Sequence, residues 1–78
     1  MKTNRQVAKD LISYHVLEYG ESIEQIRNSR MGHSEKGCSA SVGMYINGKL
    51  HSNKIFVKQN GEEEIFSLKD IYDEVKKD

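Results

Sequence analysis

The most reactive side chains in this 78-residue sequence are one cysteine and three histidines. Cys38 would act as a nucleophile if His33 or His51 lay within hydrogen-bonding distance, because a catalytic thiol needs a lowered pKa and a nearby base. A lone cysteine beside an expected strand is more often a packed or half-exposed small residue. A small enzyme with a Cys38 nucleophile is therefore only the third function that we consider.

Motifs for metal and nucleotide binding are incomplete. The histidines and the cysteine contain no pair at the i, i+4 spacing of a helical zinc site, and there is no CxxC. Gly32 and Gly37 have the glycine spacing of a phosphate loop, GxxxxGK[ST], but Cys38 stands at the lysine position. We therefore expect a non-enzymatic protein with no catalytic residue, no metal and no cofactor.

Basic side chains concentrate in the middle of the chain. Residues 27–61 contain six Lys and Arg residues against one acid, Glu35, although the whole sequence has a formal net charge of zero. Neighbouring strands can bring such cations onto one surface that suits an acidic protein patch or nucleic acid, although lysines that only keep strands soluble give the same pattern. With the polar aromatic residues among them, the candidate partner-binding residues are Arg27, Arg30, His33, Lys36, Tyr45, Lys49, Lys54 and Lys58.

The N-terminal part of the chain has helical periodicity. Thr3 or Asn4 can cap a first helix, and Gly20 can end it in a left-handed conformation. The apolar face of that helix is expected to contain Val7, Ala8, Leu11, Ile12, His15 and Tyr19. Residues 22–25 match a capping box and start a second helical segment, either a separate helix or a kinked continuation. Residues 31–39 lack an apolar period and are interpreted as a loop.

The rest of the chain predicts a meander followed by a helix. Apolar residues alternate over 40–46, and two further strands are expected around 50–57 and at 65–66. The connecting Asn47-Gly48 and Asn60-Gly61 pairs favour the positive φ angles of type I′ hairpin turns.

A final helix is expected to begin after Ser67, with an apolar stripe at helical spacing that would pack on the sheet. The stripe consists of Leu68, Ile71, Tyr72 and Val75. The sequence therefore predicts one small α+β domain over residues 1–78, with an N-terminal helix or helix pair, a three-stranded antiparallel β-meander, and a C-terminal helix packed on the sheet.

Composition limits the class of protein further. Leu, Ile, Val and Phe account for only eighteen of the 78 residues, so the core is lean, and a homodimer would supply extra burial. One cysteine and no apolar leader indicate the cytoplasm. No run approaches the roughly 18 apolar residues of a membrane span, so no membrane partner is expected.

The order of helix, three strands and helix resembles that of double-stranded-RNA-binding domains in topology. That family contacts phosphates through a lysine-rich start of its last helix, where this sequence has Ser67-Leu68-Lys69-Asp70. It also has a longer, histidine-bearing loop where this sequence has Asn47-Gly48. The resemblance therefore implies the fold alone. Certain small phage-encoded inhibitors of bacterial defence enzymes have a similar element order, which by analogy favours a phage or mobile-element type of regulator.

By elimination, the leading hypothesis is a protein-binding module, a small regulator or inhibitor of a larger macromolecule whose partner is another protein with an acidic surface. The alternative is a nucleic-acid-binding domain that uses the basic middle segment. A continuous cationic surface around an exposed Tyr45 would favour nucleic acid, whereas mixed charge around an apolar patch would favour a protein partner.

Overall fold

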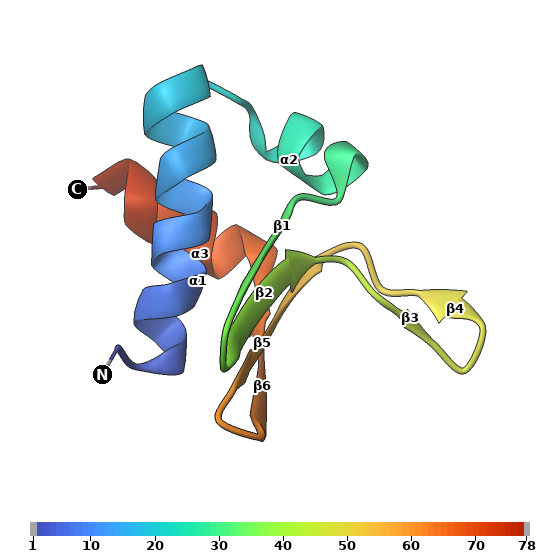
Figure 1. The fold of residues 1–78 in the computed structure, drawn as a ribbon. Helices are drawn as coiled ribbons and strands as arrows, with labels where there is room; N and C mark the ends of the chain where they lie inside the picture. The colour runs from blue at the N-terminus through green and yellow to red at the C-terminus, as the bar shows by residue number, and fades with distance from the viewer. Residues whose placement is uncertain (1, 78) are drawn as a thin grey trace.

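The computed structural model describes residues 2–77, and its helices cover one face of an antiparallel sheet (Figure 1). The helical elements are α1 (Asn4–Ser13), the π-helical turn η1 (Tyr14–Glu18), α2 (Ile23–Ser29) and α3 (Leu68–Lys77). The strands are β1 (Gly32–Glu35), β2 (Cys38–Val42), β3 (Tyr45–Ile46), β4 (Lys49–Leu50), β5 (Lys54–Gln59) and β6 (Glu62–Ser67). The predicted α+β class and element order are confirmed, but the main sheet has four strands, β1-β2-β5-β6, rather than three.

The first helix begins and ends near the predicted residues. The Thr3 side chain caps it, accepting a hydrogen bond from the Gln6 backbone N–H at 3.1 Å. Gly20, at φ +63°, follows the end of the helical segment. The prediction was wrong for Tyr19, which is 62% exposed, while Val16 is buried. The π turn explains the difference, because its wider turns displace the residues after Ser13 from the helical period.

The second helical segment is a separate helix. The predicted capping box is present, since the Ser22 hydroxyl accepts from the Gln25 N–H at 3.2 Å and the Gln25 side chain accepts from the Ser22 N–H at 2.8 Å. Ile26 buries the inner face of α2. Arg30 ends α2 in the left-handed conformation, at φ 50°.

The expected loop over residues 31–39 is a hairpin instead. Strand β1 pairs with β2 in antiparallel register from Gly32 opposite Ser41 to Glu35 opposite Cys38. Gly37, at φ +77°, provides the positive φ angle in the turn between them. All four residues of β1 are exposed, so the strand has no apolar alternation by which the sequence could reveal it.

Both predicted Asn-Gly turns are confirmed, with φ between 52° and 85° at all four residues. The first turn, however, lies in a separate two-stranded ribbon formed by β3 and β4. Gly43, at φ +84°, breaks the predicted 40–46 strand, and the predicted 50–57 strand divides into β4 and β5. Figure 1 shows this ribbon projecting from the main sheet.

The last helix packs as predicted. The Ser67 hydroxyl accepts from the Asp70 N–H at 3.4 Å, and Leu68, Ile71 and Val75 are buried. Helix α3 lies against α1 and β6, and α1 lies against β5. The shared core consists of Ala8, Leu11, Ile12, Val16, Ile26, Ala40, Val42, Ile55, Val57, Phe66, Leu68, Ile71 and Val75.

Candidate functional site

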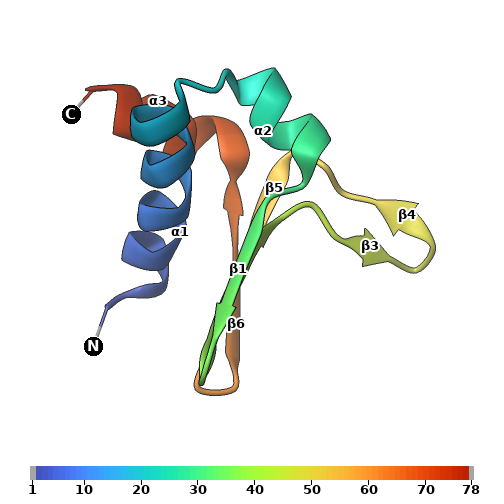
Figure 2. The same ribbon diagram turned by 45° about the horizontal axis from the view of Figure 1, so that its top comes forward.

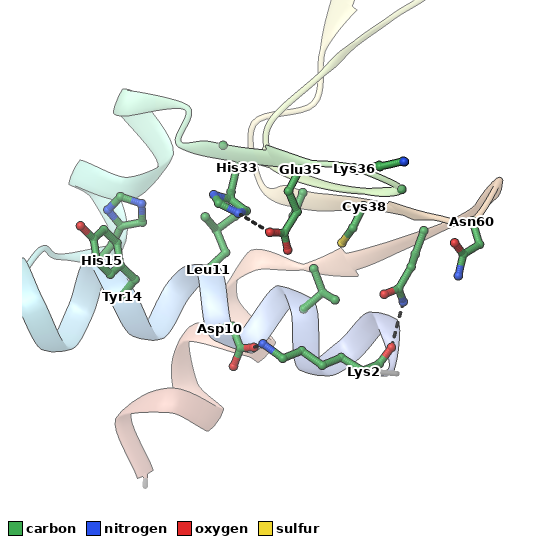
Figure 3. A pocket seen from close by; sticks show the side chains of 15 residues that line it. Lys2, Asp10, Leu11, Tyr14, His15, His33, Glu35, Lys36, Cys38 and Asn60 are labelled. Carbon is green, nitrogen blue, oxygen red and sulfur yellow. Dashed lines mark hydrogen bonds and ion pairs between the residues drawn. The ribbon is translucent and has the colours of Figure 1, made fainter.

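A groove of about 820 Å³ lies between α1 and the β1–β2 hairpin (Figure 3). In the orientation of Figure 2, α1 and β1 stand on opposite sides of this region. Val7 and Leu11 of α1 and Ala40 of β2 give the groove apolar walls and floor. The groove is open because α1 packs over β5, which leaves the helix-facing side of β1 uncovered.

The outer edge of β1 forms one rim of the groove. The Met31 carbonyl accepts from the Val42 N–H at 2.7 Å, so these two residues form a hydrogen-bonded pair. Hydrogen-bonded and non-hydrogen-bonded pairs alternate along an antiparallel ladder, so His33 and Glu35 also form backbone hydrogen bonds with β2. The backbone N–H and C=O groups of Gly32 and Ser34 therefore point away from β2, toward the open edge of the sheet. Strand β1 stands at the end of the sheet order, so its outer edge is a template for a further strand.

Charged side chains of β1 lie above the groove. His33 and Glu35 share the face of their partners Ala40 and Cys38, and their side chains line the groove. The His33 Nε2 and Glu35 Oε2 atoms are 3.8 Å apart, and both side chains are exposed. Lys36 extends from the tip of the hairpin (Figure 3).

The opposite rim, at the start of α1, is held in place by polar contacts. Lys2 Nζ donates to Asp10 at 2.6 Å, and Gln6 Nε2 donates to the same carboxylate at 2.8 Å. The hydrogen bond from Lys2 lowers the pKa of Asp10 below its ordinary value. Gln59 of β5 donates to the Lys2 carbonyl at 2.9 Å, which ties this rim to the sheet. The rim therefore carries a paired carboxylate and ammonium group.

An aromatic cluster closes the η1 end of the groove. The hydroxyl groups of Tyr14 and Tyr19 are 3.0 Å apart, and their rings meet edge to face with centroids 5.3 Å apart. This hydrogen bond raises the pKa of Tyr14. The buried His15 places Nδ1 3.1 Å from Glu21 Oε1, so its ring is held in one orientation.

Cys38 is half-buried and lines the groove, but it has no hydrogen bond or ion pair with a histidine among residues 2–77. Its cross-strand partner on β1 is Glu35, whereas His33 stands opposite Ala40. His51 follows β4 and lies outside the groove lining. The described residues also contain no cluster of three or more His, Cys, Asp or Glu side chains that could hold a metal ion. Among the described residues no histidine is hydrogen-bonded to Cys38 as a general base, so its role as a nucleophile stays a hypothesis.

The eight predicted partner-binding residues lie in three places. His33 and Lys36 line the groove. Lys54 and Lys58 lie on the other face of the sheet, because Ile55 and Val57 between them face the helices. The third group lies at the ribbon and the adjoining α2: Arg27, Arg30, Tyr45 and Lys49. Within it, the Arg30 guanidinium carbon is 5.1 Å from the Tyr45 ring centroid.

The sequence did not identify the groove itself. Its helical side comes from Val7, Asp10 and Leu11, which periodicity assigned to core or surface without a functional role. Its strand side includes the outward amides of Gly32 and Ser34, in a segment interpreted as a loop. The available sequence signal was Gly37, since glycine tolerates the positive φ angle, here +77°, that the turn between two short strands requires.

Comparison of the chain with protein families, characterised proteins and solved structures finds no match. None of the helices between residues 2 and 77 is long and apolar enough to cross a membrane. The groove and the exposed edge of β1 are therefore the basis for the function proposed below.

Proposed function

We propose that the protein is a protein-binding module that captures an extended segment of its partner along β1. The observation that supports this most directly is the outward-facing backbone of Gly32 and Ser34 beside an open, apolar groove. A partner strand would pair with these groups, and its alternate side chains would enter the groove toward Leu11 and Ala40. Main-chain hydrogen bonds would supply affinity, and the groove would supply specificity.

The charges around the groove favour a polypeptide over a nucleic acid at this site. Asp10 and Glu35 stand beside Lys2, His33 and Lys36, so the lining carries both signs of charge. Phosphates would be repelled by the two carboxylates, whereas a peptide of mixed polar and apolar residues has matching groups of both kinds. The segment would therefore have moderate charge and an apolar residue at alternate positions.

In this role the chain would act as a small regulator or inhibitor, occupying a segment of a larger macromolecule without chemistry of its own. A reducing compartment such as the cytoplasm suits its unpaired cysteine. No cofactor is required for strand addition.

The proposal is tested by selecting peptides from a random displayed library against the immobilised full chain. The affinity of a recovered peptide is then measured by fluorescence anisotropy, and its site is located from backbone amide shifts in NMR spectra. The largest shifts are expected in β1 and in the part of α1 that faces it.

The decisive variant is Ser34→Pro. Proline removes an N–H that points away from β2, so the sheet keeps its own hydrogen bonds while the partner strand loses one. We expect peptide affinity to fall about fivefold or more, since one hydrogen bond contributes about 1 kcal/mol. Ser34→Ala is the matched control and should bind within about twofold of the wild-type chain.

Equal binding by both variants, with unchanged circular dichroism and melting temperature, would rule out strand addition at β1. Recovery of peptides whose amide shifts fall away from β1 and α1 would refute the groove as the site.

A further inference from the structure

The cations of the described chain fall into two groups. One group has acidic partners, in the pairs Lys2–Asp10, Arg5–Glu74, Lys9–Glu74, Lys58–Glu63 and Lys69–Asp73. Arg27 of α2, Lys49 of β4 and Lys54 at the start of β5 have no ion pair with any residue between 2 and 77. No Asp or Glu occurs between Glu35 and Glu62, so this part of the molecule offers unneutralised positive charge.

The ribbon formed by β3 and β4 also exposes aromatic and apolar side chains. Tyr45 is 59% exposed, and its neighbours Met44 and Ile46 are exposed as well. Figure 2 shows the ribbon projecting away from the main sheet. Exposed apolar groups on a projecting element indicate a contact surface.

The Tyr45 ring is held in place on one side. The Arg30 guanidinium lies over it, with the carbon 5.1 Å from the ring centroid. The Arg30 stem lies beside Gly43, where a side-chain Cβ would be in ordinary van der Waals contact with Arg30 Cγ at 3.7 Å. Arg30 and Tyr45 therefore form an ordered cation–π pair, with most of the tyrosine ring still accessible.

Two lysines lie on the ribbon and at its base. Lys49 stands opposite Ile46 on the other face of the ribbon, whereas Tyr45 pairs with Leu50. Lys54 lies at the base of the ribbon, where its carbonyl accepts from the Gly43 N–H at 3.0 Å. A polyanion that wraps around the ribbon would meet Arg30 at the Tyr45 ring, Lys49 on the other face and Lys54 at the base.

We infer that the ribbon binds single-stranded nucleic acid, with a base stacked on Tyr45 and the backbone phosphates beside Arg30, Lys49 and Lys54. Charge alone would suit an acidic peptide equally well, but an exposed aromatic ring flanked by cations is the arrangement on which unpaired bases stack. In a duplex the base faces are already stacked, so Tyr45 would have nothing to cover. This inference goes beyond the proposed capture of a peptide and uses a different surface.

The test measures binding of the full chain by fluorescence anisotropy at about 50 mM salt. The probes are a labelled single-stranded oligothymidylate of about 12 nucleotides, a hairpin duplex of equal length and a labelled polyglutamate peptide. We expect the single strand to bind most tightly. Its log Kd should rise with log salt with a slope of about 2, since three phosphates are neutralised at about 0.7 each.

Tyr45→Leu should weaken binding of the single strand about 5- to 150-fold, the effect of losing one stacked base. Tyr45→Phe keeps the ring and should retain binding, which separates stacking from damage to the ribbon. Tyr19→Leu removes a tyrosine of similar exposure, just after η1, and is the matched control. Lys49→Gln and Lys54→Gln should each lower the salt slope by about 0.7, whereas Lys69→Gln, on α3, should leave it unchanged.

Absence of single-strand binding at this salt concentration would overturn the inference. So would equal affinity for polyglutamate or the duplex, or equal affinity of Tyr45→Leu and Tyr19→Leu for the single strand. Ser34→Pro should not affect oligonucleotide binding, so failure of the groove and failure of the ribbon can be told apart.

Discussion

Replacement of Ile71 by alanine should test how α3 packs into the core. Ile71 is completely buried, with 0% of its surface exposed, between Leu68 and Val75 on the apolar stripe. Ile71→Ala removes three buried carbon atoms, which at about 0.8 kcal/mol for each methylene costs about 2.4 kcal/mol in transfer free energy. The cavity left behind raises the total to about 3–4 kcal/mol.

This loss is a large share of the roughly 5–15 kcal/mol by which small domains are stable. Urea unfolding followed by circular dichroism at 222 nm should show a lower midpoint with an unchanged slope. The melting temperature should fall by about 12–30 °C, at about 4–8 °C for each kcal/mol in a domain of this size.

Ile65→Ala provides the matched control, because Ile65 is 55% exposed on the sheet face away from the helices. We expect it to cost less than about 1 kcal/mol. If both substitutions lowered the free energy of unfolding equally, the packing of α3 on the sheet would be refuted.

Three further predictions concern the turns, an ion pair and the thiol. Gly61 lies at φ +85° in the β5–β6 hairpin, and Gly61→Val should lower the free energy of unfolding measured in urea by about 1–3 kcal/mol. Gly48→Val should change hydrogen exchange in the ribbon but lower the global free energy of unfolding by less than about 0.5 kcal/mol, because the ribbon contributes no residue to the core. Equal global losses would contradict the independence of the ribbon. The hydrogen bond from Arg5 lowers the pKa of Glu74 below its ordinary 4.5, so the pair stabilises the fold above that pH and loses its effect as the pH falls through the lowered value. Melting temperatures measured between about pH 2 and 7 should therefore fall less steeply on the acid side for Glu74→Gln than for the wild-type chain; parallel curves would refute this. Cys38→Ser should leave stability and peptide binding unchanged, and loss of an activity without loss of stability would restore the enzyme hypothesis.

The parts of the fold that the sequence predicted are those fixed by local chemistry. Asn47-Gly48 and Asn60-Gly61 adopt positive φ angles at both residues, which few other residue pairs accept. The stripe that includes Ile71 has a helical period strong enough to identify both the helix and its buried face. These signals require no knowledge of distant residues.

The elements that were missed depend on tertiary context. Strand β1 contains only Gly32, His33, Ser34 and Glu35, all exposed, and it pairs because β2 presents an edge to it. The π turn rotates Tyr19 outward, and no pattern in its residues marks the change of period.

The candidate site was predicted only in part for a related reason. Charge counting found a basic segment, but the sequence alone does not show which face of a strand each cation occupies. Lys54 and Lys58 turn away from the groove that His33 and Lys36 line. The other wall comes from Leu11, which is remote in sequence and was identified only as an apolar helix residue.

The contact between α1 and α3 has a consequence for synthesis on the ribosome (Figure 1). Ala8 and Ile12 of the first helix share a core with Ile71 and Val75 of the last. At about 5–20 residues per second, several seconds pass between the emergence of α1 and that of α3. Throughout that interval the nascent chain exposes an apolar helix face that only its own later residues can cover. A chain cut short before α3 would leave the α1 face that Ile71 and Val75 contact uncovered.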